Sequence, residues 1–405
     1  MSVNRLVYQA QKKDKKLNPI RYCDRWILLA TMALSIFGCV MIVSATMGTA
    51  AGSFKLLFST IMKQVVFIVF GYGLMFSSNK WFKVSLLDKE MFLRTLILMM
   101  AILLFLPLLY TDSNGAHAWI PLGFASIQPS EFAKVGVIML IACYLGDKDK
   151  SSFVHFKTMF NTCGFLVLFF TAVVVFAQGD FGSGMVMFCI AYICVLVPNS
   201  KRLSNVQRTM KIAIVFAMIA VIVILILPIG ETIVDGFFFL KEYQKARIFS
   251  ARNPFVDQYN TGYQLINGLV AFASGGFFGN GFGNSVRKFT NFPAANTDYI
   301  LSIVVEEMGF LAYVFVFMLY AVIIFQLFNY AKKMKNEKGR IILVGMAAYI
   351  FIHFLFNVGG VTGLIPLTGV PLLLLSSGGS SAAAVLLGLG IAQAVISQYR
   401  MGVIK

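Results

Sequence analysis

Apolar runs of nearly twenty residues recur along almost the whole chain, and they constrain its fold more than any other feature. Each run is long enough to cross a hydrocarbon core of roughly 30 Å. Inside lipid the backbone must pair its own polar groups, which leaves helices or a closed barrel. Because the apolar residues are continuous rather than alternating, the sequence predicts an all-α integral membrane protein.

The runs predict about ten membrane-spanning helices. Only 13% of the residues are charged and 59% are hydrophobic, whereas a soluble domain has about 25% charged residues. The prediction divides the chain into a basic segment 1–25, a ten-helix domain 26–397 and a short tail 398–405. The predicted spans are Trp26–Met47, Phe58–Ser78, Phe92–Tyr110, Pro129–Leu145, Asn161–Phe176, Phe181–Val197, Ile212–Ile229, Tyr299–Phe328, Ile341–Asn357 and Ser380–Ile396.

The formal net charge of +17 is distributed in a way that predicts topology rather than nucleic-acid binding. Of the 34 Lys and Arg residues, 25 lie in the N-terminus, the C-terminal tail and alternate connections between spans. The connections 111–128 and 358–379 hold none. Positive-inside bias therefore places both termini in the cytoplasm. Attraction to anionic membrane lipid and topology setting alone are two open explanations of the surplus.

Cysteine and histidine placement argues against a disulfide framework and a zinc site. All six Cys fall in or beside predicted spans or at the cytoplasmic end, and the three His are scattered without a ligand pattern. We therefore predict no metal ligands. The first span is too long for a signal-peptide core, so we interpret it as an uncleaved anchor.

One extracellular connection, residues 230–298, is exceptionally long. Its aromatic residues and mixed charge argue against disorder, so we expect a structured loop packed on the outer membrane surface. Its glycine cluster, 275–283, lacks the strand–turn–helix context of a dinucleotide fingerprint. Backbone N–H groups that approach a pyrophosphate and a flexible turn are both open interpretations of this cluster.

Ionisable residues inside spans are costly, so each is a functional candidate. Glu131 and Lys134 are three residues apart and share a helix face. They are either a charged cavity wall for a phosphate-bearing ligand or a self-neutralising pair that orients helices, with equal weight from the residues alone. Glu306 and Glu307 lie near the outer end of the eighth span, and at least one must face a cavity or a partner.

A carboxylate closes the long outer loop. Asp298 is expected to meet the outer aqueous face beside a helix N-terminus, which favours its ionised form. A carboxylate at that depth suits general-base chemistry on a lipid-linked substrate, and an ordinary helix cap is the alternative. Asp180, in the turn before the sixth span, is better explained as a turn residue and cap.

Six short motifs occur in order along the chain. They are Gly115–Gly123, Gln128–Glu131 with Lys134, Gly262–Leu265, Gly281–Ser285, Asp298 with Glu306–Gly309, and Gly369–Leu372 with Ser377–Ser381. Together they resemble the SEDS family (shape, elongation, division and sporulation), and the resemblance covers the chain from about the first span to the last.

The resemblance implies a ten-span peptidoglycan glycosyltransferase that polymerises lipid II, the undecaprenyl-pyrophosphate-linked disaccharide-pentapeptide, on the outer membrane face. The family's key aspartate corresponds to Asp298 and its loop tryptophan to Trp119, and its cavity charges correspond to Glu131 and Lys134. We predict Asp298 as the catalytic base. The predicted substrate-binding residues are Trp119, Glu131, Lys134, Arg247, Glu306, Ser380 and Ser381.

Several positions depart from the family pattern. Ala118 stands where the family often has Arg, and Ala294 and Asn296 replace its Glu and His before the aspartate. Gly179 replaces a proline and Ser377 replaces a tyrosine. Because Asp298 is retained, we still expect activity, and the departures put helper roles at the changed positions in doubt.

The resemblance also implies partners. A class B penicillin-binding protein would cross-link the glycan, and other division-complex membrane proteins are expected beside it. The segments 262–265 and 281–285 resemble FtsW more than RodA, which favours septal synthesis. A divalent cation, Mg²⁺ or Mn²⁺, is an open expectation. A lipid II flippase and a non-catalytic scaffold for a penicillin-binding protein are the rival functions.

Overall fold

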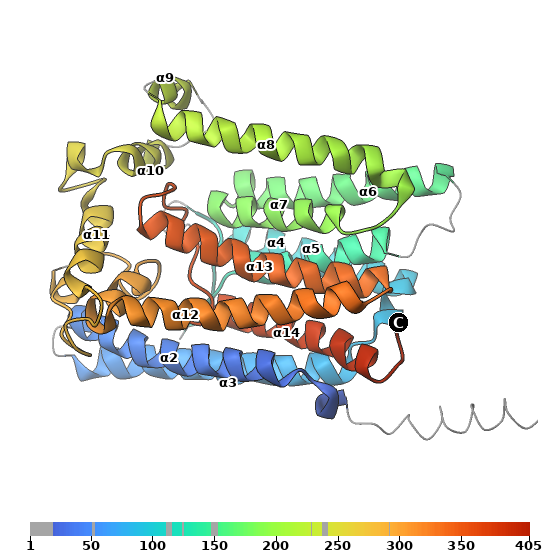
Figure 1. The fold of residues 1–405 in the computed structure, drawn as a ribbon, viewed down its shortest axis with the longest axis horizontal. Helices are drawn as coiled ribbons and strands as arrows, with labels where there is room; N and C mark the ends of the chain where they lie inside the picture. The colour runs from blue at the N-terminus through green and yellow to red at the C-terminus, as the bar shows by residue number, and fades with distance from the viewer. Residues whose placement is uncertain are drawn as a thin grey trace, which may run out of the picture.

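The protein is a bundle of long helices that run side by side (Figure 1). The computed structural model describes residues 19–50, 53–110, 116–123, 125–146, 153–227, 229–236, 242–290 and 292–405. The two strands in these ranges, β1 (Ile120–Pro121) and β2 (Ser126–Ile127), form a short antiparallel hairpin. The predicted all-α integral membrane protein is confirmed.

Each of the ten predicted spans coincides with a helix. Eight of these helices in the described ranges are long and apolar enough to cross a membrane, while α5 and α7 have only 17 and 16 residues. Ten crossings and the cytoplasmic position of both termini stay predictions. The helices are α2 (Arg25–Ala50), α3 (Phe54–Trp81), α4 (Glu90–Phe105) with η4 (Leu106–Leu109), α5 (Pro129–Leu145), α6 (Phe153–Ala172) with η5 (Val173–Ala177), α7 (Phe181–Leu196), α8 (Ser204–Ile226), α12 (Ile300–Lys333), α13 (Glu337–Val361) and α14 (Gly379–Arg400).

The centre of the bundle is formed by α5, α13 and α14. Nearly every residue of α5 and α14 is buried. Small residues permit this close packing: a Cβ built at Gly390 of α14 would lie 2.4 Å from the carbonyl oxygen of Met75 in α3. In contrast, α8 lies at the edge of the bundle and has no buried residue (Figure 1). The short helix α5 is therefore surrounded by protein, which explains how it tolerates two charged residues.

The long loop is structured, as the sequence predicts. Its described parts form α9 (Ile229–Asp235), α10 (Glu242–Arg252), η7 (Pro254–Asp257), α11 (Tyr263–Gly275) and η8 (Arg287–Phe289), short helices at the end of the bundle opposite the C-terminus (Figure 1). Other short 3₁₀ helices lie outside this loop, namely η2 (Pro19–Tyr22), η3 (Val84–Asp88) and η6 (Lys201–Leu203).

The glycine cluster pairs with a kink in α12. Gly309 has φ 74° and ψ −175°, which interrupts the helical hydrogen bonds there. The loop replaces them: Asn280 N–H donates to Glu306 O (3.0 Å), Gly281 N–H donates to Glu307 O (2.9 Å), and Phe310 N–H donates to the carbonyl of Gly276 (2.9 Å). The N–H groups of Asn280 and Gly281 are therefore occupied within the protein and are not available to a pyrophosphate.

The two glutamates before the kink are buried in a polar cluster. Glu307 forms an ion pair with Lys288 (2.8 Å), and neither side chain is exposed. Ser44 of α2 donates to both oxygens of Glu307 at 2.6 and 2.8 Å. Glu306 accepts hydrogen bonds from Ser285 Oγ and from Val286 N–H. The cluster thus fastens the long loop to α2 and α12.

Candidate active site

A cavity of about 950 Å³ lies between the long loop, the segment 365–371 and the adjacent ends of α7, α8 and α13. Its polar side carries Trp119, Arg247 and Asp298, whereas α7 and α8 supply an apolar side. The lining residues are Ala116, Ala118, Trp119, Gln128, Gly179, Asp180, Phe181, Gly182, Met185, Val221, Ile224, Leu225, Gln244, Arg247, Ile248, Gln264, Ala294, Thr297, Asp298, Phe356, Ile365, Pro366, Leu367, Thr368, Gly369, Pro371, Ser377 and Gly378.

Asp298 is half-buried in the turn that precedes α12. The N-cap of this helix is Tyr299, so the alternative of Asp298 as an ordinary helix cap is not supported. Burial raises the pKa of the Asp298 carboxyl above its usual value, and the nearby Arg247 guanidinium lowers it in part. A raised pKa on a cavity carboxylate is the property expected of a general base.

Arg247 reaches the same point of the cavity from α10. Its Nη1 donates to the carbonyl oxygen of Leu367 (3.3 Å). A Cβ built at Gly369 would lie 3.4 Å from Arg247 Nη1 and 3.9 Å from an Asp298 carboxylate oxygen. Gly369 has φ +73°, so glycine suits both its backbone conformation and the narrow space between these two groups. The cation and the candidate base therefore converge on Gly369.

Trp119 is half-buried on the cavity wall, directly before β1. The structure thus brings together three of the eight predicted site residues, namely Trp119, Arg247 and Asp298. The other five do not line the cavity.

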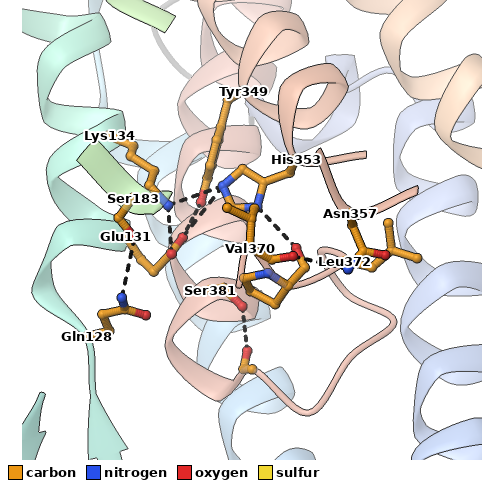
Figure 2. A network of polar contacts seen from close by, with 12 residues as sticks. Gln128, Glu131, Lys134, Ser183, Tyr349, His353, Asn357, Val370, Leu372 and Ser381 are labelled. Atoms are coloured by element: carbon orange, nitrogen blue, oxygen red, sulfur yellow. Dashed lines mark hydrogen bonds and ion pairs between the residues drawn. The ribbon is translucent and has the colours of Figure 1, made fainter. Parts of the chain in front are cut away.

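Glu131 and Lys134 belong to a buried network of polar side chains (Figure 2). The two side chains are 1% and 0% exposed, and Lys134 Nζ lies 2.7 Å from Glu131 Oε1. Tyr349 donates to the second oxygen of Glu131 (3.0 Å), and Lys134 Nζ also contacts His353 Nε2 (3.2 Å). This geometry matches the self-neutralising pair, and the described cavity surface includes neither residue.

The remaining predicted substrate-binding residues are Glu306, Ser380 and Ser381, and their side chains are also held by contacts within the protein. Glu306 is held by Ser285 and Val286, as described above. Ser380 and Ser381 are buried in the first turn of α14, where Ser381 Oγ donates to the Gly378 carbonyl (2.9 Å). None of the three lines the cavity, whereas the preceding residues Ser377 and Gly378 do.

Asp180 is a cavity carboxylate that the sequence argument set aside. Its side chain accepts from Ser183 N–H (3.0 Å) and so caps α7, as predicted. The other oxygen accepts from Gln128 Nε2 (2.6 Å), and both residues line the cavity. The sequence contained the signal, a carboxylate in an outer turn, but a capping role and a cavity role are compatible.

The cavity is not electropositive. Among its described lining residues, Arg247 is the one cationic side chain, and the same lining holds the carboxylates of Asp180 and Asp298. Within the part of the chain that the structure describes, no group of three His, Cys, Asp or Glu side chains could hold a metal ion. An anionic ligand would therefore depend strongly on Arg247.

The comparison with protein-family models decides the family. The model of the FtsW, RodA and SpoVE proteins, described as a cell cycle protein family, matches residues 24–401. The chain belongs to this family.

Relatives within the FtsW–RodA–SpoVE family align over most of their length. A protein of Bacillus subtilis (strain 168) named "Probable peptidoglycan glycosyltransferase FtsW" is 30% identical over 87% of this chain and 85% of its own. Stage V sporulation protein E of the same organism is 30% identical over 93% of this chain and 96% of its own.

Solved structures of the family share this fold. One, reported as "Structural coordination of polymerization and crosslinking by a peptidoglycan synthase complex", matches with a TM-score of 0.66 at 23% identity, over 93% of this chain and 98% of its own. The rod shape determining protein RodA of Thermus thermophilus matches with a TM-score of 0.59 at 22% identity, over 93% and 97% of the two chains. At these identities the likeness concerns the fold.

Proposed function

We propose that this FtsW–RodA–SpoVE family member is a peptidoglycan glycosyltransferase that polymerises lipid II at the outer face of the bacterial cytoplasmic membrane. One observation carries the proposal: a single cavity joins Asp298 and Arg247 to an apolar wall from α7 and α8. A lipid-linked sugar needs such a combination, because its reacting centre is polar and its polyprenyl tail is not. The name of the Bacillus subtilis relative supports the same activity.

The reaction would be an inverting glycosyl transfer. Asp298 would accept the proton of the acceptor GlcNAc 4-hydroxyl while that oxygen forms a bond to C1 of the donor MurNAc. The bond from C1 to the donor's pyrophosphate oxygen breaks, and its electron pair leaves with undecaprenyl pyrophosphate. Arg247 would stabilise the charge that develops on this leaving group. We expect Arg247 rather than Lys134 to stabilise the leaving pyrophosphate, because the Lys134 side chain is enclosed in its own network.

A divalent cation is an open expectation from the sequence. The side chains that the cavity offers as ligands fit a protein-bound metal ion poorly. The cavity offers the carboxylates of Asp180 and Asp298, and the described residues form no three-ligand group. Mg²⁺ or Mn²⁺ would instead accompany the pyrophosphate of the substrate. We therefore assign no step of the reaction to a protein-bound metal.

The proposal extends to partners and to the site of action. The structural neighbour reported as a peptidoglycan synthase complex couples polymerization with crosslinking, which supports a class B penicillin-binding protein as the partner of this chain. The names of the FtsW relatives and the motifs at 262–265 and 281–285 favour division, with other division-complex proteins nearby. Sporulation is the second candidate, supported by the stage V sporulation relative.

Glycan-chain formation tests the activity. Purified protein in detergent would be incubated with labelled lipid II, alone and with a candidate class B penicillin-binding protein, and the products separated by length. We expect polymer, with a higher yield when the partner is present. Unreacted lipid II under both conditions, from protein that remains folded, would refute the activity.

A flippase is the rival that the geometry addresses most directly. Coupling carboxylates of a transporter are expected near the bilayer midplane, and the carboxylates in α12 that could serve this purpose are Glu306 and Glu307. Both are held in the polar cluster with Ser285, Lys288 and Ser44, and the described cavity lining contains neither. This arrangement favours the enzyme over the transporter.

Arg247 is expected to set the pH range of activity. Asp298 must be deprotonated to act as a base, burial raises its pKa, and Arg247 counteracts that rise. In Arg247→Met this counteraction is lost, so the Asp298 pKa rises further and the acidic limb of the rate profile moves to higher pH. Arg247→Lys should retain most of the effect.

The matched control for this prediction is Lys245→Met. Lys245 lies on the same helix, pairs with Glu242 and donates to the Asp235 carbonyl rather than lining the cavity. Its removal should leave the pH profile in place. Identical acidic limbs for wild type and Arg247→Met would show that Arg247 does not act on the base.

A further inference from the structure

One face of α13 carries three buried polar side chains at intervals of four residues. Tyr349, His353 and Asn357 are 0%, 0% and 1% exposed, and residues four apart lie on the same side of a helix. A buried polar group is stabilising only when its hydrogen bonds are satisfied. Together these side chains contact α5, the segment 370–371 and the turn at Asp298, so the face connects α13 to several parts of the site (Figure 2).

Two of these side chains, Tyr349 and His353, contact the buried ion pair of Glu131 and Lys134. Tyr349 contacts Glu131, and His353 lies between Lys134 Nζ (3.2 Å) and the Pro371 carbonyl oxygen (3.2 Å). A lysine ammonium can only donate hydrogen bonds, so His353 Nε2 accepts. We therefore assign the ring proton to Nδ1, which donates to Pro371 O. His353 thus links the cavity-lining residue Pro371 to the buried network of Glu131 and Lys134.

The third side chain, Asn357, contacts the main chain of the candidate base, Asp298. Asn357 Nδ2 donates to the main-chain oxygen of Asp298 (2.8 Å) and to that of Val370 (3.1 Å). Its Oδ1 is buried and has no hydrogen-bond partner among the described residues. Both hydrogens of one amide therefore join the turn that carries Asp298 to the wall segment 367–371.

This amide also connects the turn that carries the base to the wall segment that accepts a hydrogen bond from the cation. The wall segment includes Leu367, whose carbonyl oxygen accepts from Arg247, and Gly369, where the two groups converge. Without the Asn357 donors, the carbonyl oxygens of Asp298 and Val370 lose this partner, and the turn and the wall can move relative to each other. A displacement of about 1 Å at a reacting centre can reduce the rate by roughly 10²-fold.

We propose that Asn357 is a positioning residue for glycosyl transfer, which holds Asp298 in register with the cavity wall that binds Arg247. The inference rests on the proposed function and adds a residue to it. Asn357 touches no substrate in this role and acts through the Asp298 main chain. The loss of its donors therefore affects turnover, while substrate affinity, which depends on the cavity surface, is retained.

The test compares Asn357→Leu with Asn79→Leu in glycan formation from lipid II. Asn79 is also a buried asparagine in a long helix (2% exposed), but it contacts Cys23 and lies outside the cavity. Both variants lose a buried amide of the same shape. Asn357→Asp is a second variant, because it keeps the shape and has no amide hydrogens to donate. Thermal unfolding would be measured for all of them.

We expect kcat to fall by roughly 10²-fold in Asn357→Leu and Asn357→Asp, with an unchanged KM for lipid II and a wild-type kcat in Asn79→Leu. Equal kcat losses at both asparagines, in proportion to lost stability, would overturn the inference, as would wild-type kcat in Asn357→Asp. Wild-type protein that makes no glycan would instead refute the proposed function, so the two failures are distinguishable.

Discussion

Replacement of Asp298 by asparagine is expected to reduce glycan-chain formation by roughly 10²- to 10⁴-fold, the range over which a positioned general base contributes. The amide has nearly the same shape as the carboxylate but cannot accept the proton of the acceptor hydroxyl. Asp298 is half-buried, and the Asn357 amide holds its main chain, so the substituted turn should keep its position. The measurement is the initial rate of polymerisation at saturating lipid II.

The control for this change is Asp257→Asn in the same outer loop. Asp257 accepts hydrogen bonds from Asn260 and Thr261 of its own segment, and it does not line the cavity. Near-normal rates are expected from this variant. A rate in Asp298→Asn equal to that of Asp257→Asn would remove Asp298 from the catalytic role.

Removal of Lys134 alone is expected to destabilise the protein by about 3–5 kcal/mol, the effect of leaving a buried charge without its partner. In Lys134→Met, Glu131 keeps Tyr349 but loses the ammonium at 2.7 Å, in an environment where it is 1% exposed. The double variant Glu131→Gln/Lys134→Met has no net buried charge, so it should recover most of the stability. Chemical denaturation in detergent measures both.

The double variant also separates the two interpretations of this pair. A structural pair predicts that the folded double variant still makes glycan at a substantial rate, because neither residue lines the described cavity. A pair that binds the pyrophosphate predicts a folded protein with greatly raised KM for lipid II. The second outcome would contradict the buried network as the account of Glu131 and Lys134.

Local patterns predicted the helices well. The span Pro129–Leu145 agrees with α5 at both ends, since proline is favourable at the first helical position and the apolar run stops at Gly146. The existence of a structured outer loop also followed from its composition. Its internal arrangement did not, because the kink at Gly309 is completed by backbone groups from the segment 276–281.

The candidate site was predictable where one residue carries the signal. The structure places three of the predicted site residues, Asp298, Trp119 and Arg247, on one cavity, and their catalytic and binding roles stay predictions. The assignment of Glu131 and Lys134 to the cavity was not supported, because their partners Tyr349 and His353 come from a helix more than 200 residues away. Such contacts are set by packing of distant helices, which a single sequence does not encode locally.

The most direct test of the central claim is one vesicle experiment in which wild-type protein is reconstituted with lipid II, and polymer and translocated lipid II are scored in the same sample. We predict glycan chains, formed only on the membrane side where the Asp298 cavity opens. Lipid II that crosses the bilayer while no polymer forms would contradict the account and identify the chain as a transporter.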